Sequence, residues 1–415
     1  MIDRIARRIA HAFLARIRVG HLVVVEDGAD RSYGSGPPSA RVCVRSPKVW
    51  RKLLRGSRGL AESYFDGLWD SPDPTAVIRV AARNVQSLDR FRARLAPVRA
   101  PFQKLRALLF SNTRARSRKA IAAHYDLGNE LFELMLDPTM SYSSAFFERP
   151  GLTLEQASVA KLELICRKLD LGPSDHVVEI GTGWGGFAAY AALTRGCRVT
   201  TTTISHEQHD YAVRRVRDAG VEHLVEVLLE DYRDLTGTYD KLVSIEMIEA
   251  VGWRHFGTFF RKCSDLLAPD GLMLLQAITV DDRAYEVEKL GRSFANTYVF
   301  PDGCLPSAEV IARCLARHTD MQTLSVGDLT PHYTETLRRW RANFDEAVVR
   351  GQLDPAYDER FRRMWRLYLS YCEAGFAERR IGVAQFAFAK PRYRSEPALD
   401  LHAVGDQALS AAAAG

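Results

Sequence analysis

The chain has 415 residues, of which 47% are hydrophobic and 26% are charged, and its formal net charge is +6. These are the values of a soluble globular protein of two or three domains. No apolar run reaches the roughly 18–20 residues that a membrane-spanning helix needs, and the N-terminus lacks the features of a secretory signal. Seven scattered cysteines without a C-x-x-C pair predict free thiols in a reducing cytoplasm, with neither a metal site nor disulfides.

The first part of the chain predicts a small, lipid-associated α+β domain over residues 1–95. Residues 2–18 place apolar side chains at helical spacing, with arginines mostly on the other faces, so we expect a basic amphipathic helix. Such a helix either lies in a lipid interface or packs on its own domain, and the pattern does not choose between the two. Strand-like runs follow at Leu22–Val25 and Arg41–Val44, and a helical segment covers Trp50–Arg55.

A basic block follows between Arg79 and Lys119, where twelve arginine and lysine residues face a single acid, Asp89. Such a block indicates an anionic partner, either a phospholipid surface or nucleic acid, although a solvated linker can have the same composition. Leucine, proline and phenylalanine residues are interleaved with the charges, which favours an anionic membrane surface and no nucleic acid partner. We expect residues 96–118 to form a basic connector.

The most informative segment is His176–Gly186. A β-branched run ends in the carboxylate of Glu179 and is followed by a glycine-rich turn and a helix of small residues, so backbone can approach a ligand beside a helix N-terminus. Nucleotides bind at this place in α/β sheets. The E-x-G-x-G spacing differs from the G-x-G-x-x-G of dinucleotide folds, and it fits S-adenosylmethionine, a nucleoside without a pyrophosphate, better. An ordinary strand–turn–helix corner is the alternative.

From residue 120 onward, strands and helices alternate in the manner of an α/β fold. The pattern predicts a Rossmann-like, seven-stranded class I methyltransferase domain over residues 119–392. Its strands are expected at 176–180, 197–204, 224–230, 240–247, 271–279, 322–326 and 381–389. An aromatic-rich insert near 280–306 is expected to cover a substrate, and Trp365 and Tyr368 are expected in the core. The small, polar tail over 393–415 is expected to be disordered.

Five segments, in one order over about 120–390, resemble the cyclopropane-fatty-acyl-phospholipid synthase family, whose core the mycolic acid cyclopropane synthases share. They are His124–Phe132, Met140–Ser144, Ser244–Gly252, Tyr298–Ser307 and His332–Trp340. The segment Gly59–Trp69 also looks like the N-terminal domain of the branch that acts on phospholipids. The resemblance implies transfer of a methyl(ene) carbon from S-adenosylmethionine to the cis double bond of an unsaturated phospholipid acyl chain, giving a cyclopropane fatty acid.

The resemblance also implies the site residues. In the family, the base that removes a proton from the transferred carbon is a bicarbonate, held by a glutamate, a histidine, a cysteine, a tyrosine and main-chain groups. The glutamate matches Glu249 and the tyrosine matches Tyr333, and both are expected to be catalytic together with Ser144 and Gln276. The cysteine is Ser144 here and the histidine is Gln276, which keep hydrogen-bond donors but alter the hold on a bicarbonate. The family's cofactor contacts match Tyr142, Ser143, Glu179, Gly181, Gly183, Thr203, Ile204, Gln208, Asp231 and Tyr232.

The two substitutions leave the product open. The carbocation formed by methyl transfer either closes to a cyclopropane, the family's commoner outcome, or loses a proton after a hydride shift to give a methylene- or methyl-branched chain. A small-molecule N- or C-methyltransferase and a lipid-binding protein without turnover are further alternatives. We expect a cytoplasmic protein that associates peripherally with the inner face of the membrane, and a homodimer is left open.

Overall fold

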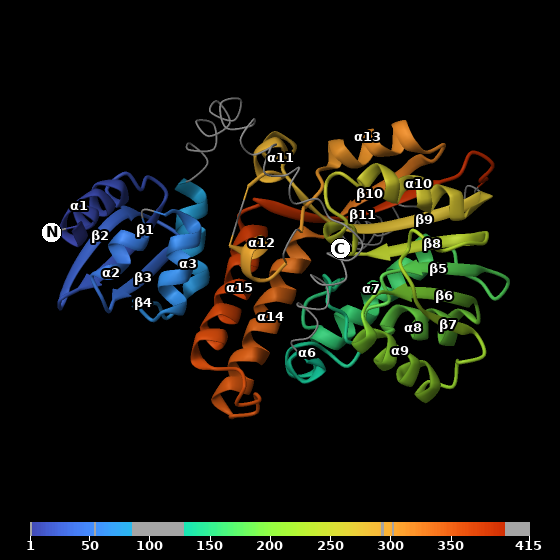
Figure 1. Cartoon of the computed structure of the whole chain (residues 1–415), viewed down its shortest axis with the longest axis horizontal. Helices are drawn as coiled ribbons and strands as arrows, with labels where there is room; N and C mark the ends of the chain where they lie inside the picture. Colours follow the sequence, from blue (N-terminus) through green and yellow to red (C-terminus); the bar gives the residue numbers. More distant parts are fainter. Residues whose placement is uncertain (1, 54, 85–127, 292–293, 301–302, 395–415) are drawn as a thin grey trace, which may run out of the picture.

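The computed structural model describes residues 2–53, 55–84, 128–291, 294–300 and 303–394. Two β-sheets organise these residues, a four-stranded sheet near the N-terminus and a seven-stranded sheet in the remainder (Figure 1). Most of the basic block, the expected boundary at residue 95, the expected connector and nearly all of the expected tail lie outside the described residues. The start of the His124–Phe132 motif lies outside them as well.

The N-terminal sheet has the strand order β2-β1-β3-β4, with β1 antiparallel to β2 and parallel to β3. Its elements are α1 (Ile2–Leu14), β1 (Gly20–Glu26), β2 (Ala29–Ser35), β3 (Ser39–Val44), α2 (Lys48–Leu53), α3 (Ser57–Phe65) and β4 (Trp69–Asp70), and residues 74–84 are helical. The expected α+β character is confirmed. The sequence analysis missed β2 and β4, because β2 is polar and almost wholly exposed and β4 has only two residues.

The larger sheet has the strand order β10-β11-β9-β8-β5-β6-β7. Its strands are β5 (His176–Ile180), β6 (Arg198–Thr203), β7 (Val225–Leu229), β8 (Tyr239–Ile245), β9 (Leu267–Val280), β10 (Gln322–Asp328) and β11 (Ile381–Ala389). Strands β5 to β9 are parallel, whereas β11 is antiparallel to β9 and β10 is antiparallel to β11. All seven expected strands are confirmed, although β9 begins at Leu267 rather than at 271 because it follows directly on the preceding helix.

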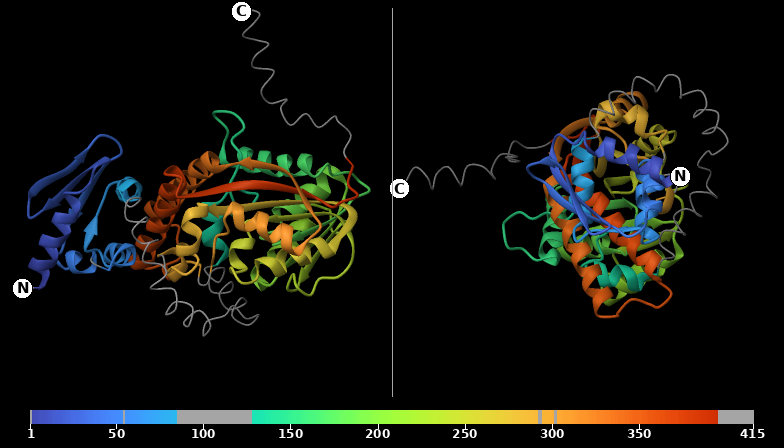
Figure 2. Two further views of the ribbon diagram at one scale, coloured as in Figure 1. Left: turned by 90° about the horizontal axis from the view of Figure 1, so that it is seen from above. Right: turned by 90° about the vertical axis from the view of Figure 1, so that its left-hand side faces the viewer.

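Helices cover both faces of this sheet, which explains the nearly continuous apolar runs of its central strands (Figure 2). The helices are α6 (Asn129–Met135), α7 (Leu154–Lys168), α8 (Gly186–Arg195), α9 (His206–Asp218), α10 (Phe256–Leu266), α11 (Asp282–Glu288), α12 (Ala295–Tyr298), α13 (Ala308–His318), α14 (Thr330–Val349) and α15 (Glu359–Ala377), with a 3-10 turn, η1 (Ile248–Ala250). The side chains of neighbouring residues in β5 point to opposite faces of the sheet. Val177 packs with Leu162 of α7, and Val178 packs with Phe259 of α10.

The N-terminal domain packs on α15 and on the insert that contains α12. Arg363 of α15 donates hydrogen bonds to the carbonyl oxygens of Tyr64 at 2.6 Å and Trp69 at 2.9 Å. Across the same boundary, the Tyr298 hydroxyl donates to Glu62 at 2.9 Å. These contacts tie the small domain to the part of the larger one that holds α12, α14 and α15 (Figure 1).

Strand β5 lies between β8 and β6, so the chain leaves it toward one side of the sheet and later returns on the other. In open parallel sheets, this reversal of strand order leaves a crevice beyond the carboxyl ends of the strands, where ligands bind. The fold therefore places the glycine-rich turn after β5 at the mouth of such a crevice.

Candidate active site

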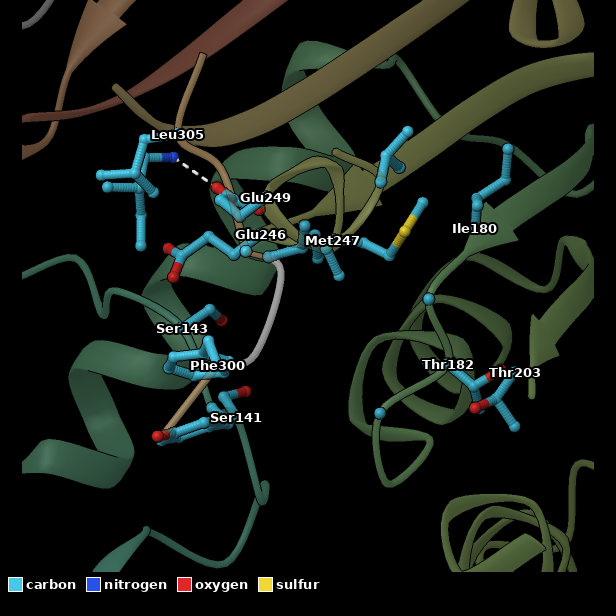
Figure 3. Close-up of a pocket in the computed structure, with 18 of the residues that line it drawn as sticks. Ser141, Ser143, Ile180, Thr182, Thr203, Glu246, Met247, Glu249, Phe300 and Leu305 are labelled. Carbon is cyan, nitrogen blue, oxygen red and sulfur yellow. Dashed lines mark hydrogen bonds between the residues drawn. The ribbon is translucent and has the colours of Figure 1, made fainter. Parts of the chain in front are cut away.

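A cavity of about 450 Å³ opens beyond the carboxyl ends of β5, β6, β7 and β8. Every residue that the sequence analysis assigned to the cofactor lines it, and so do Glu249 and Tyr333. Figure 3 shows Glu246 and Glu249 side by side on one wall, with Thr182 and Thr203 across the open space. The fold thus brings together residues from 142 to 333 in one chamber, since consecutive parallel strands end at the same edge.

The turn after β5 fits S-adenosylmethionine because its backbone can come into close contact with a ligand. Gly181 has φ 106°, and a Cβ atom there would lie only 3.0 Å from the Cβ atom of Met247. Gly183 has φ 52°, and a Cβ atom there would stand in open space. Glycine is therefore favoured at the first position by its backbone conformation and by the closeness of Met247, while at the second it leaves the wall of the cavity bare.

Polar side chains around this half of the cavity are fixed by their neighbours. Glu179 is buried and accepts a hydrogen bond from the Thr201 hydroxyl at 2.7 Å, and burial raises its pKa to about 8. Gln208 is held by the Thr203 hydroxyl at 2.8 Å. Asp231, after β7, pairs with Arg233 at 2.5 Å. A buried carboxylate such as Glu179 suits a ligand that carries positive charge.

The other half of the cavity is apolar and largely aromatic. Phe300, Tyr333, Tyr368 and Phe376 line it, and the rings of Tyr333 and Phe376 lie 4.4 Å apart. The sequence analysis placed Tyr368 in the core. That expectation is wrong in part, because the hydroxyl of Tyr368 reaches the hydroxyl of Tyr142 at 2.9 Å on the cavity wall. Trp365, one turn earlier in α15, is fully buried as expected.

Glu249 lies in η1, just beyond β8. Its Oε1 atom accepts a hydrogen bond from the backbone N–H of Ile278 at 2.6 Å. Its Oε2 atom is buried and has no hydrogen-bond partner among the described residues. Burial, with a smaller contribution from the nearby charge of Glu246, raises the pKa of Glu249 to about 8. Its placement suits the catalytic role that the sequence analysis assigned to it.

Glu246 is the functional residue that the sequence analysis did not single out. It directly follows β8 and has φ 50°, an uncommon conformation for a residue with a side chain. Its carboxylate accepts three hydrogen bonds, from the backbone N–H of Ser144 at 2.9 Å, from Gln276 at 2.8 Å and from the Tyr333 hydroxyl at 2.7 Å. Burial raises the pKa of Glu246, and the three donors oppose that rise.

Ser144 and Gln276 do not line the cavity but lie fully buried behind Glu246. The Ser144 hydroxyl donates to the carbonyl oxygen of Ala145 at 3.0 Å, so only its backbone N–H points to the anion. The donors that the resemblance assigns to bicarbonate are therefore already bound to Glu246. These residues do not fit a bicarbonate ion at that position.

A buried cation completes the site. Lys161 of α7 is 1% exposed, and its Nζ atom donates to the Ser143 hydroxyl at 3.1 Å. Burial lowers the pKa of Lys161, whereas the carboxylates of Glu246, Asp137 and Glu179 raise it. Lys161 thus offsets part of the negative charge that gathers around the cavity.

Within the described residues, no group of three or more His, Cys, Asp and Glu side chains is arranged to hold a metal ion. All seven cysteines are free thiols. No helix in the described part of the chain combines the length and the apolar character needed to cross a membrane.

Comparison with known proteins decides the family. The sequence model described as mycolic acid cyclopropane synthetase matches residues 112–386. The chain belongs to this family. One solved member of the family is bound to SAH, and this family member is an S-adenosylmethionine-dependent methyltransferase with the class I fold.

Relatives and solved structures among the matches have names that refer to fatty acids or fatty-acyl lipids. The chain is 39% identical to the tuberculostearic acid methyltransferase of Mycobacterium tuberculosis, over 86% of this chain and 87% of that one. It is 36% identical to the cyclopropane-fatty-acyl-phospholipid synthase of Escherichia coli, over 86% and 89%. A mycolic acid cyclopropane synthase solved with SAH and CTAB is 31% identical, with a TM-score of 0.61 over 66% of this chain and 98% of that chain.

The bare wall at Gly183 gives a first prediction. We expect Gly183→Leu to weaken SAH binding by at least about tenfold, because the new side chain enters the open half of the cavity and a non-glycine residue at φ 52° adds about 1–2 kcal/mol of strain. Isothermal titration calorimetry measures the affinity.

Gly28 supplies the matched control. It also has a positive φ and open space at its Cβ position, but it lies in the turn between β1 and β2. Gly28→Leu carries similar backbone strain and should bind SAH as the wild type does. Equal affinities in the two variants would contradict the assignment of the Gly183 wall to the cofactor.

Proposed function

We propose that this family member transfers a methyl(ene) carbon from S-adenosylmethionine to the cis double bond of an unsaturated acyl chain in membrane phospholipid, giving a cyclopropane fatty acid. The observation that carries the proposal is that one cavity is lined both by the glycine-rich turn after β5, where the donor would bind, and by aromatic side chains that could contact an acyl chain, Phe300, Tyr333 and Tyr368. The half-buried side chains of Glu246 and Glu249 line the same cavity, as do Ile245 and Ile278.

The chain's residues fit the demands of this chemistry. The donor supplies an electrophilic methyl group when bound. The aromatic half excludes water, which protects a carbocation from capture, and the ring faces of Tyr333 and Phe376 attract positive charge. Glu249 and Glu246 supply fixed negative charge without solvent rearrangement.

The direct test uses the full chain with methyl-labelled S-adenosylmethionine and vesicles of dioleoyl phosphatidylglycerol. Esterified fatty acids are then analysed by mass spectrometry. We expect labelled acyl chains whose mass is greater by one CH2 unit, with the ring at the position of the former double bond. The proposal is abandoned if SAH binds by calorimetry and yet no labelled acyl chain forms from any unsaturated phospholipid.

A branched product is the second candidate. The relative with 39% identity is named a tuberculostearic acid methyltransferase, which favours a methyl-branched or methylene-branched chain as the outcome. Both products share the first transfer step and differ in whether a hydride shift precedes the loss of the proton. Ring and branched esters fragment differently, so the same mass spectra decide between them.

We further propose that α1 attaches the protein to an anionic membrane. Ala6 and Ala10 are buried against the N-terminal domain, so α1 does pack on its own domain. On its outer side, Ile5, Ile9 and Phe13 form one row and are 54%, 51% and 52% exposed. Figure 1 places α1 far from the larger sheet, at the outer end of the molecule. Exposed arginines at positions 4, 8 and 16 border the row and suit anionic headgroups. A cytoplasmic location at the inner face of the membrane, and a homodimer, stay predictions.

This surface gives a second prediction. We expect Ile9→Glu to lower binding to dioleoyl phosphatidylglycerol vesicles by roughly tenfold or more, since burial of one isoleucine side chain contributes about 1.5–3 kcal/mol. Cosedimentation measures the bound fraction. Val349→Glu is the control, because Val349 is 85% exposed at the end of α14 and lies outside the proposed surface. If both variants sediment like the wild type, α1 is not the attachment site.

A further inference from the structure

We propose that Glu246 is the proton acceptor of the reaction, so that a carboxylate built into the chain does the work that a bound bicarbonate would otherwise do. This inference rests on the proposed function and names the base at the same site. It predicts that turnover needs no bicarbonate.

The first support is the position of the Glu246 carboxylate. It lines the cavity, and it binds the Ser144 backbone N–H, the Gln276 side chain and the Tyr333 hydroxyl at 2.7–2.9 Å. Three donors from three distant segments converge on one carboxylate, which is the arrangement of a preformed anion site. The anion is a side chain of the protein itself, the carboxylate of Glu246. This residue keeps a φ of 50° although that backbone conformation is strained.

The second support is a hydrogen-bond chain that fixes the direction of the Gln276 amide. Lys168 of α7 donates to Oε1 of Gln385 at 2.9 Å, and Nε2 of Gln385 donates to Oε1 of Gln276 at 3.0 Å. The Oε1 atom of Gln276 is thereby used as an acceptor, and its Nε2 atom is left to donate to Glu246. The buried network is thus oriented to meet a negative charge at position 246.

The third support is that the carboxylate keeps room for a proton. Oε1 of Glu246 accepts two hydrogen bonds, whereas Oε2 accepts only the one from Tyr333 among the described residues. A carboxylate oxygen has two lone pairs, so Oε2 retains one for a proton. The pKa of Glu246 is raised by burial, which makes it a stronger base than an exposed glutamate, and the pKa of Tyr333 is raised as well, so its hydroxyl keeps its own proton.

The π electrons of the acyl double bond form a bond to the methyl carbon, the carbon–sulfur bond of the donor breaks, and its electron pair stays on sulfur. A C–H bond of the transferred carbon then gives its electrons to the new ring bond, and the proton passes to Oε2 of Glu246. In the branched outcome, a hydride shift first moves the positive charge to the carbon that bears the transferred methyl group. The same oxygen of Glu246 then takes a proton from a carbon bonded to that centre. The Glu246 carboxylic acid releases its proton to solvent after product leaves.

The test compares Glu246→Gly with Glu246→Gln in bicarbonate-depleted buffer and after addition of bicarbonate. Glycine tolerates the positive φ and opens space for an anion, whereas glutamine fills the space without a basic oxygen anion. We expect each variant to lose about 100-fold in kcat, the usual range for loss of a general base, and only the glycine variant to regain activity with bicarbonate. Wild-type kcat should be the same in both buffers. Glu286→Gln, on the exposed side of α11, controls for loss of one carboxylate.

Calorimetry gives a readout that does not depend on turnover. Bicarbonate titrated into the SAH complex should bind to Glu246→Gly and not to the wild type, and all variants should retain SAH binding. Wild-type activity that disappears on bicarbonate depletion, bicarbonate binding to the wild type, or a Glu246→Gln variant as fast as the wild type would each overturn the inference. If the wild type methylates no phospholipid, the proposed function fails, and the calorimetric comparison still decides whether Glu246 occupies the anion position.

Discussion

Replacement of Glu249 by glutamine is expected to lower kcat by roughly 10²–10³-fold, the range seen when one fixed electrostatic group is removed from an active site. The substitution keeps the size of the side chain and its hydrogen bond from Ile278, but removes a buried charge that faces the cavity. Product formation with dioleoyl phosphatidylglycerol measures kcat, and calorimetry should show little change in SAH affinity. A variant that keeps wild-type kcat would exclude Glu249 from the catalytic machinery.

The raised pKa of Glu249 adds a pH dependence to this prediction. Its folded-state pKa is about 8 against an ordinary value of 4.5, because burial and the neighbouring Glu246 disfavour its charge. The ionised form is therefore present mainly above pH 8, and wild-type kcat should rise as the pH approaches that value. The same shift means that this group's stabilising contribution is complete below pH 4.5 and is lost as the pH rises through about 8. The free energy of unfolding of Glu249→Gln, measured by urea titration, should consequently fall less over this interval than that of the wild type. Part of the fall in the free energy of unfolding remains in both proteins, because the pKa of Glu179 is also about 8.

Lys161→Met is expected to have the largest effect on stability. The lysine is buried among Glu246, Asp137 and Glu179, and methionine has a similar length but leaves their charge without compensation. Removing one member of a buried charge group typically lowers the free energy of unfolding by about 3–5 kcal/mol. At about 2 °C per kcal/mol for a domain of this size, the midpoint of thermal unfolding should fall by roughly 6–10 °C.

Differential scanning calorimetry measures that midpoint. Lys48→Met is the control, because it also removes one positive charge but from an exposed position at the start of α2. If the Lys161 variant has the same midpoint of thermal unfolding as the control and the wild type, the lysine does not balance the charge of the carboxylates around it.

The main sheet could be predicted from the sequence because its strands are buried on both faces. Apolar runs bounded by glycine and polar residues located all seven strands, and the glycine-rich turn located the cofactor end of the sheet. Strand β2 was not predicted because Asp30, Arg31 and Ser32 give it no apolar face. Its strand character comes from backbone pairing with β1. The boundaries of the domains stay predictions, since the connecting residues lie outside the described ranges.

The site could be predicted where residues follow directly on strands, and not where the tertiary structure decides. The assigned cofactor residues line one cavity because strand ends meet at one edge. Lys161 looks like an ordinary surface lysine in an amphipathic helix, and only the packing of α7 buries it. Glu246 stands three residues before Glu249, and the presence of a second carboxylate so near in the sequence was a signal that it could belong to the site. Its role depends on a backbone dihedral and on donors from residues 144, 276 and 333, which no local pattern reveals.

The insert that carries α12 has a mechanical consequence for how lipid reaches the enzyme. Ala295 belongs to the wall of the chamber, while the adjoining Phe294 is clamped between the ring of Phe65 in the small domain and the ring of Tyr371 in α15. A displacement of the small domain would therefore be passed through Phe294 to the chamber wall at Ala295, so the two domains are mechanically coupled at this point.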